Sequence, residues 1–125
     1  MRPFARQLRR AVYATSALSI LAFTPAAFAQ EMSLQQHIDA VREDGRFMPE
    51  RALQRLQEVE TQARAAPLLV RAEFLTQLSN ARMRLGQHDV AMQLAEELIA
   101  DARQHDSDVA LAKGMLNKAY ITFAM

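Results

Sequence analysis

The stretch AEFLTQLSNARMRLGQHDVAMQLAEELI, residues 72–99, decides how this chain is expected to fold. Its apolar residues recur every three or four positions on both sides of Gly86, a spacing that places them along one face of an α-helix. Glycine is favoured where a helix ends. The stretch therefore predicts two amphipathic helices joined by a short turn, which makes them antiparallel neighbours.

The same spacing predicts five helices after residue 29. Their expected limits are Ser33 (N-cap) to Gly45, Pro49 to about Ala65, Pro67 to Gly86, Val90 to Ala102, and from a cap at Asp106 or Ser107 to the last residues of the chain. The last helix carries Val109, Ala112, Leu116, Ala119 and Phe123. The 125 residues include only three glycines and four prolines, and the chain is long enough for one small domain. The expected fold class is all-α.

The first 29 residues have the pattern of a secretory signal peptide. Four arginines precede an apolar run at residues 11–23, and the small-x-small site Ala27-Phe28-Ala29 follows. An uncleaved membrane anchor is the alternative, but spanning a bilayer takes about 20 apolar residues, and this run is shorter. We expect cleavage after Ala29 and export of the remainder.

The charge balance changes once that segment is set aside. Four of the 15 basic residues lie in residues 1–29 and all 14 acidic residues lie after them, so residues 30–125 carry a formal net charge of −3. They also lack a cluster of basic residues interleaved with aromatics, which argues against a nucleic-acid partner. The chain contains no cysteine, and this excludes disulfides and thiolate metal sites.

Two pairs of segments suggest an internal repeat. ALQRLQEVETQAR (52–64) and AMQLAEELIADAR (91–103) are identical at five of thirteen positions with an offset of 39, and LSNA (78–81) matches LNKA (116–119) at two positions with an offset of 38. A period of nearly forty residues with two helices in each unit is typical of an α-solenoid. The alternative is chance similarity between helices rich in alanine, glutamine and glutamate.

Residues 72–99 resemble a tetratricopeptide repeat. Leu75 and Leu78 lie in the expected first helix, Gly86 at the turn, and Ala91 and Ala95 where the second helix packs closely. The family usually has a large aromatic residue where Arg82 stands, and Tyr120 supplies one in the next unit. The resemblance implies that residues 30–125 form a domain of stacked helical hairpins. The last repeat of this domain is expected to be incomplete.

The signal peptide together with RALQRLQEVE, LSNARMRLGQHDVA and DVALAKGMLNKAYITFAM resembles the exported sensor regions that begin many bacterial membrane-bound diguanylate cyclases of the GGDEF type. This resemblance implies a periplasmic sensing or docking role. It does not imply cyclase activity for residues 1–125, which show neither the cyclase domain nor the transmembrane helix of those proteins. The alternative function is the sensory beginning of such a membrane-bound diguanylate cyclase, and cyclase activity would be expected only if the chain continues beyond residue 125.

The segment KAYITFAM (118–125) indicates where a partner could bind. Tyr120, Phe123 and Met125 form an apolar face that no further predicted helix covers. We expect either a chain that stops short of its next repeat or an interface, closed by self-association or by a partner helix. A membrane contact is expected only through the signal peptide or a missing C-terminal part.

No motif for catalysis, metal or cofactor binding is recognised. The three histidines lie on separate predicted elements, and the sequence has no phosphate-binding loop, nucleophile elbow or calcium loop. The chain is expected to be a non-enzymatic module that binds a protein or peptide. The repeat resemblance places Glu73, Asn80, Arg84 and Lys118 on its binding face, and the alternative is that they form an ordinary solvated surface.

Overall fold

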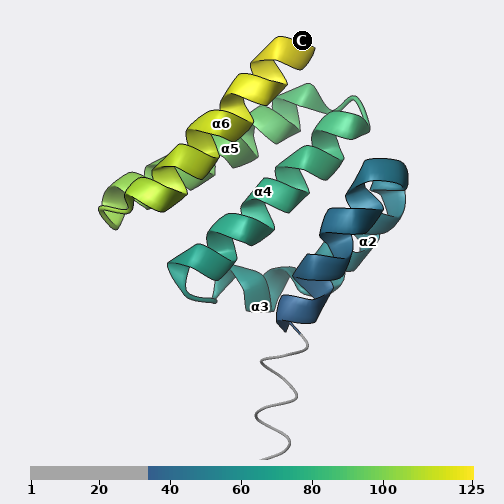
Figure 1. Cartoon of the computed structure of the whole chain (residues 1–125), viewed down its shortest axis with the longest axis horizontal. Helices are drawn as coiled ribbons and strands as arrows, with labels where there is room; N and C mark the ends of the chain where they lie inside the picture. The colour runs from purple at the N-terminus through teal and green to yellow at the C-terminus, as the bar shows by residue number, and fades with distance from the viewer. Residues whose placement is uncertain (1–33) are drawn as a thin grey trace, which may run out of the picture. The chain divides into compact units, whose positions relative to one another are not determined.

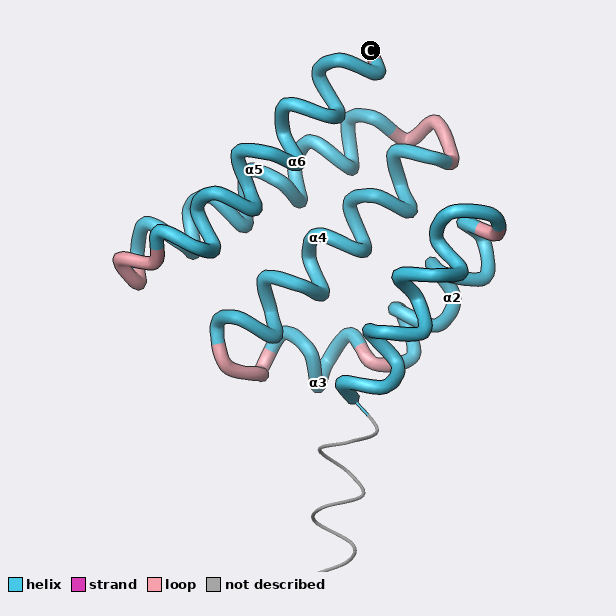
Figure 2. The backbone as a smooth tube through the Cα atoms, viewed as in Figure 1, coloured by secondary structure: helices cyan, strands magenta, loops and turns pink. Residues whose placement is uncertain are grey.

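The computed structural model describes residues 34–125, and all regular secondary structure in this part of the chain is helical, without a strand. The fold class is therefore all-α, as predicted. Figure 2 shows the helices separated by short loops. The predicted signal peptide and the predicted cap at Ser33 lie outside the described residues. None of the described helices is both long enough and apolar enough to cross a membrane.

Six helical segments make up the described part. A helix over residues 34–47 is followed by α2 (Pro49–Glu58), α3 (Glu60–Arg64), α4 (Leu68–Arg84), α5 (His88–Gln104) and α6 (Asp108–Ala124). The helix α4 packs against α2 and α3 and also against α5 and α6. In Figure 1, α4 lies between α2 and the pair formed by α5 and α6, and α6 passes in front of α5.

The first helix does not end at Gly45 as predicted. It runs to residue 47, and Met48 has the non-helical angles φ −138° and ψ 69°. Pro49 explains the end point, because a proline ring disfavours the helical conformation in the residue before it. Gly45 is tolerated within the helix.

The predicted second helix is interrupted at Val59, so the described residues have one helix more than expected. The N–H of Val59 donates to the carbonyl of Leu56, three residues back, at 3.2 Å. This tightens the last turn of α2, and φ of Val59 is −111°. Beyond the break, the helix resumes as α3. The bend keeps Val59 buried together with Ala52, Leu56 and Ala63.

The two turns after α4 and α5 form in the same way. Gly86 has φ 76°, and the N–H groups of Gly86 and Gln87 bond to the carbonyls of Met83 and Arg82. This is a Schellman motif, which satisfies the free carbonyls of a helix end. Asp106, with φ 50°, has the corresponding role after α5. The side-chain oxygen of Ser107 then accepts a hydrogen bond from the N–H of Ala110 at 3.2 Å, so Ser107 is the cap of α6.

The 39-residue correspondence aligns residues of equal burial. The following residues are all buried: Ala52, Leu56, Val59 and Ala63 in α2, α3 and the break between them, and Ala91, Ala95, Leu98 and Ala102 in α5. In both segments these residues turn one apolar stripe toward the core. The two segments therefore use the same helical face.

The 38-residue correspondence between α4 and α6 does not hold in the same way. Leu78 is buried, but Leu116, aligned with it, is 58% exposed. The helix α6 instead buries Ala110, Gly114 and Asn117, which follow the buried Phe74, Leu78 and Ala81 by 36 residues. The offset of 36 differs from the offset of 38 by two residues, which corresponds to a rotation of about 200° around the helix axis. As a result, the more apolar side of α6 faces outward.

Gly114 explains why the other side of α6 packs inward. A Cβ atom at this position would lie 2.8 Å from Cγ1 of Ile99 and 3.2 Å from its backbone nitrogen. Only glycine lets the two backbones approach this closely. The contact fixes both the rotation of α6 and its distance from α5.

Candidate functional site

A charged network connects three helices through Glu73 of α4. Its Oε1 accepts hydrogen bonds from Arg42 Nη2 at 2.7 Å and from Gln77 Nε2 at 3.0 Å. Its Oε2 accepts one from Lys113 Nζ of α6 at 3.1 Å. Arg42 belongs to the helix of residues 34–47. One carboxylate therefore holds the first helix and the last helix to α4.

The electrostatics of this network keep Glu73 ionised. Burial raises the pKa of Glu73, but the hydrogen bonds from Gln77, Arg42 and Lys113 outweigh it and hold the pKa at about 2, below the ordinary 4.5. The hydrogen bond to Glu73 raises the pKa of Arg42 in turn. Because both oxygens of Glu73 already have partners within the chain, this predicted site residue joins helices in the described structure.

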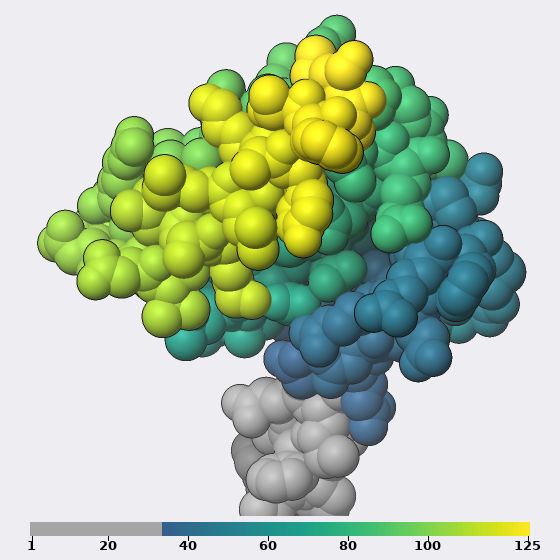
Figure 3. Space-filling model, turned by 45° about the horizontal axis from the view of Figure 1, so that its top comes forward, coloured from purple at the N-terminus to yellow at the C-terminus, as the bar shows by residue number. Residues whose placement is uncertain are grey.

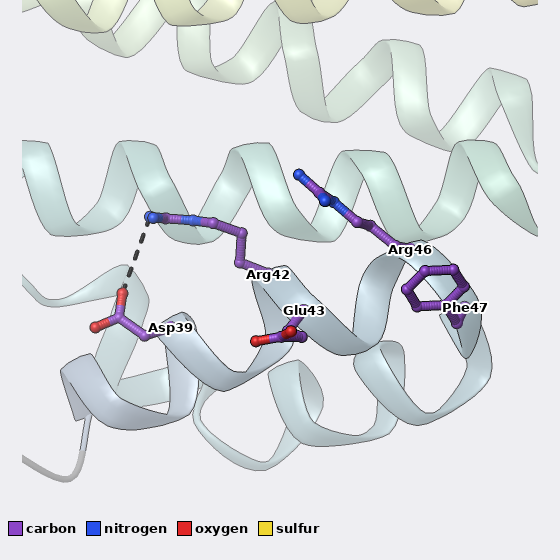
Figure 4. A pocket seen from close by; sticks show the side chains of 5 residues that line it. All are labelled: Asp39, Arg42, Glu43, Arg46 and Phe47. Carbon is purple, nitrogen blue, oxygen red and sulfur yellow. Dashed lines mark ion pairs between the residues drawn. The ribbon is translucent and has the colours of Figure 1, made fainter.

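Asn80 and Arg84 lie further along α4. Asn80 is half-buried and Arg84 is exposed. Arg84 Nη1 donates to the backbone carbonyl of Arg46 at 3.3 Å. Beside this contact, a hollow of about 340 Å³ is lined by Asp39, Arg42, Glu43, Arg46 and Phe47 (Figure 4). Arg84 reaches the edge of this hollow through its contact with Arg46, and the role of Asn80 and Arg84 as a peptide-binding pair stays a prediction.

Lys118 lies elsewhere. Its Nζ forms an ion pair with Glu96 of α5 at 3.4 Å. These two residues line a groove of about 430 Å³ between α5 and α6, together with Ile99, Ala100, Arg103 and Met115. The structure thus places Lys118 on the α5 side of α6, apart from the network around Glu73.

Five of the ten exposed large hydrophobic side chains among the described residues belong to α6, and Met125 follows directly after it. The predicted residues Tyr120, Phe123 and Met125 are 59%, 93% and 72% exposed. Val109 and Leu116 belong to the predicted stripe of the last helix, but exposure was not predicted for them or for Met115, and each is more than half exposed. Figure 3 shows α6, in yellow and yellow-green, spread over the surface of the molecule.

The stripe that the sequence predicts for the last helix lies on the exposed face of α6. Val109, Ala112, Leu116, Ala119 and Phe123 follow one another at intervals of three and four, the pattern of a coiled-coil seam. We call these five residues the α6 seam. All five are exposed, and all five are uncharged.

The two lysines that flank the α6 seam are paired with neighbouring helices, and the exposed Asp108 precedes the seam at its N-terminal end. Lys113 pairs with Glu73 of α4, and Lys118 pairs with Glu96 of α5. The seam lies between these two lysines on the side of the helix away from both neighbours. A helix or sheet edge that docked on it would meet an apolar surface about four turns long, with no charge among its five residues.

The remaining polar clusters hold helices together. Arg71 of α4 donates to Asp101 of α5 from Nε at 2.6 Å and from Nη2 at 2.9 Å, and it also donates to the carbonyl of Ala66. The hydrogen bond from Arg71 lowers the pKa of Asp101. Within residues 34–125, no three metal-ligating side chains converge on one point.

Comparison with protein-family models, with curated proteins and with solved structures finds no match for this chain. A functional assignment therefore starts from the described residues themselves. Of the features above, the charged network and the Arg71–Asp101 pair are satisfied within the chain. The α6 seam is the feature that has no partner among the described residues.

Proposed function

We propose that residues 34–125 form a non-catalytic, tetratricopeptide-like interaction module whose docking surface is the outer face of α6. One observation carries the proposal: the more apolar of the two sides of α6 is the exposed one. Its inner side presents Ala110, Gly114, Asn117 and Ile121, whereas its outer side presents the α6 seam. A contiguous exposed apolar patch commonly marks a site of protein–protein contact.

The energetics favour a protein or peptide partner. Covering a side chain such as Leu116 or Phe123 contributes about 1.5–3 kcal/mol to the free energy of binding. Little of this contribution is lost to conformational entropy, because α6 does not have to become ordered on binding. The helix is already held to α5 by the Gly114 contact and to α4 by the Lys113–Glu73 ion pair. A partner would therefore meet a preformed ridge.

A helix is the partner element that fits best. Ala112 and Ala119 have smaller side chains than Val109, Leu116 and Phe123 of the α6 seam, and side chains of a second helix can pack over such small residues. The predicted signal peptide would place this docking event in the periplasm. Mass spectrometry of the protein made from the complete sequence should then show an N-terminus at Gln30.

Site-specific photo-crosslinking in the producing cells tests the proposal. A photoreactive phenylalanine at Phe123 should yield a crosslinked protein adduct, and the same probe at Leu69, which is 57% exposed on α4, should not. Adding Leu116→Glu should remove the adduct. If the probe at Phe123 gives no adduct of any mass, the docking surface is not used and the proposal fails.

A further inference from the structure

We infer that the occupant of the α6 seam is a second copy of this chain, with the two α6 helices packed antiparallel. The inference rests on the proposed function and names its partner. Its starting point is the pattern of the seam, in which large residues at 109, 116 and 123 alternate with alanines at 112 and 119. Each large side chain is followed by a gap one helical turn away.

Two antiparallel copies of this pattern complement each other in size. When Leu116 faces Ala119 of the second copy, Phe123 faces Ala112 of the second copy, and the two-fold axis produces the same contacts in reverse. Leu116 and Phe123 then each meet a hole, whereas Val109 lies at the end of the pair with no seam residue of the second copy opposite it. A parallel pair would instead place Phe123 against Phe123 and Ala112 against Ala112, which leaves crowded and empty layers.

The charges are compatible with self-association. Two identical faces repel each other when they carry like charges, but the α6 seam carries none. The flanking Lys113 and Lys118 are neutralised by Glu73 and Glu96 of the same subunit. Joining two copies therefore brings no unpaired lysine against another.

The available area indicates a weak and reversible dimer. Aromatic side chains bury about 150–250 Å² each when fully covered. If the exposed parts of Leu116 and Phe123 and of the flanking Met115 and Tyr120 are covered in both copies, the pair would bury about 1,000 Å². This lies at the low end for specific interfaces, so we expect dissociation constants on the order of micromolar rather than nanomolar.

Sedimentation velocity over a range of protein concentrations tests the partner. Protein expressed from the complete sequence should pass from monomer to dimer as its concentration rises through the micromolar range. Leu116→Glu should remain monomeric throughout. Leu69→Glu is the matched control, because Leu69 is a leucine of nearly equal exposure (57% against 58%) on α4, and this variant should still dimerise.

Cysteine crosslinking tests the direction of the pair, and the chain has no cysteine of its own to interfere. Ala112→Cys and Phe123→Cys variants should form a disulfide when they are mixed and oxidised, because the antiparallel register sets these positions opposite each other. Neither variant should crosslink alone. Its two copies of the cysteine would lie about 16 Å apart along the helices, beyond the reach of a disulfide.

Three results would overturn the inference. A wild-type protein that stays monomeric excludes the second copy as the occupant. Dimerisation of Leu116→Glu moves the interface to another surface, and crosslinking of each cysteine variant alone makes the pair parallel. A monomer that still gives a heterologous adduct at Phe123 in cells would leave the proposed docking function standing with a different partner.

Discussion

The helices α4 and α6 have the same length but opposite surroundings. Each has 17 residues, and α6 is the more apolar, with eleven apolar residues against nine in α4. Yet α4 is buried on two sides, between α2 with α3 and α5 with α6, whereas α6 is covered on one side. Phe74 of α4 is fully buried and Phe123 of α6 is 93% exposed.

The difference shows that apolar content does not decide burial by itself. A helix buries the side that can approach its neighbour closely, and on α6 that side contains Gly114. Close backbone approach increases the number of dispersion contacts over the whole length of the interface. The larger apolar residues of α6 remain outside, where another molecule can cover them.

The largest expected effect is the difference in stability loss between alanine substitutions at Phe74 and at Phe123. Phe74→Ala leaves a cavity in the core and should lower the free energy of unfolding by about 3–5 kcal/mol. Phe123→Ala should change it by less than about 0.5 kcal/mol when the protein is dilute enough to be monomeric. Urea unfolding followed by circular dichroism measures both. Equal losses would mean that α6 is covered as α4 is.

The next effect concerns the carboxylate that joins these helices. The pKa of Glu73 is about 2 in the folded chain against an ordinary 4.5, so its contribution to stability is complete above pH 4.5 and is lost as the pH falls toward 2. Its side chain is 15% exposed. After allowance for solvent screening, we expect the free energy of unfolding to fall by about 1–3 kcal/mol as the pH falls from 4.5 toward 2.

Glu73→Gln separates this contribution from those of other carboxyl groups. The variant should be less stable than the wild type at pH 6, and the two should converge toward pH 2 in urea unfolding experiments. Glu96→Gln is the control, since the exposed Glu96–Lys118 pair should contribute less than about 1 kcal/mol. A constant difference between Glu73→Gln and the wild type at every pH would contradict the assigned role.

Buried polar residues give a third contrast between the helices. Ser79 of α4 donates a hydrogen bond to the carbonyl of Ala91 at 2.8 Å, whereas the amide of Asn117 on α6, 3% exposed, has no partner among the described residues. Ser79→Ala should lower the free energy of unfolding by about 1 kcal/mol. Asn117→Leu should raise the thermal midpoint, because an unsatisfied buried amide is destabilising. A lower midpoint for Asn117→Leu would show that the amide is satisfied in solution.

The smallest expected effect compares two helical glycines. Gly45→Ala meets no atom within 4 Å and should stabilise the first helix by about 0.5–1 kcal/mol. Gly114→Ala gains the same helix propensity but brings Cβ against Ile99, so its net effect should be destabilising by about 1 kcal/mol. Chemical denaturation of both variants decides the sign. Stabilisation by Gly114→Ala would mean that α6 is free to move away from α5.

Much of the fold could be predicted from the sequence because helix signals are local. The turn at Gly86 and the cap at Ser107 depend on a few neighbouring residues, and both formed as expected. The break at Val59 could not be predicted, because the 3.6-residue pattern continues through it. For the site, the pattern predicted exposure of Tyr120, Phe123 and Met125, but it missed Leu116, which the 38-residue alignment equated with the buried Leu78.

The sequence by itself determined that this protein is helical, where most of its helices begin and end, and that it has no disulfides. These properties follow from backbone propensities, caps and composition, which act over a few residues. The tertiary structure alone decided which side of α6 faces inward and that Glu73 joins three helices. The physical reason is that α6 has two sides capable of packing, and only the approach of Ile99 to Gly114 selects between them.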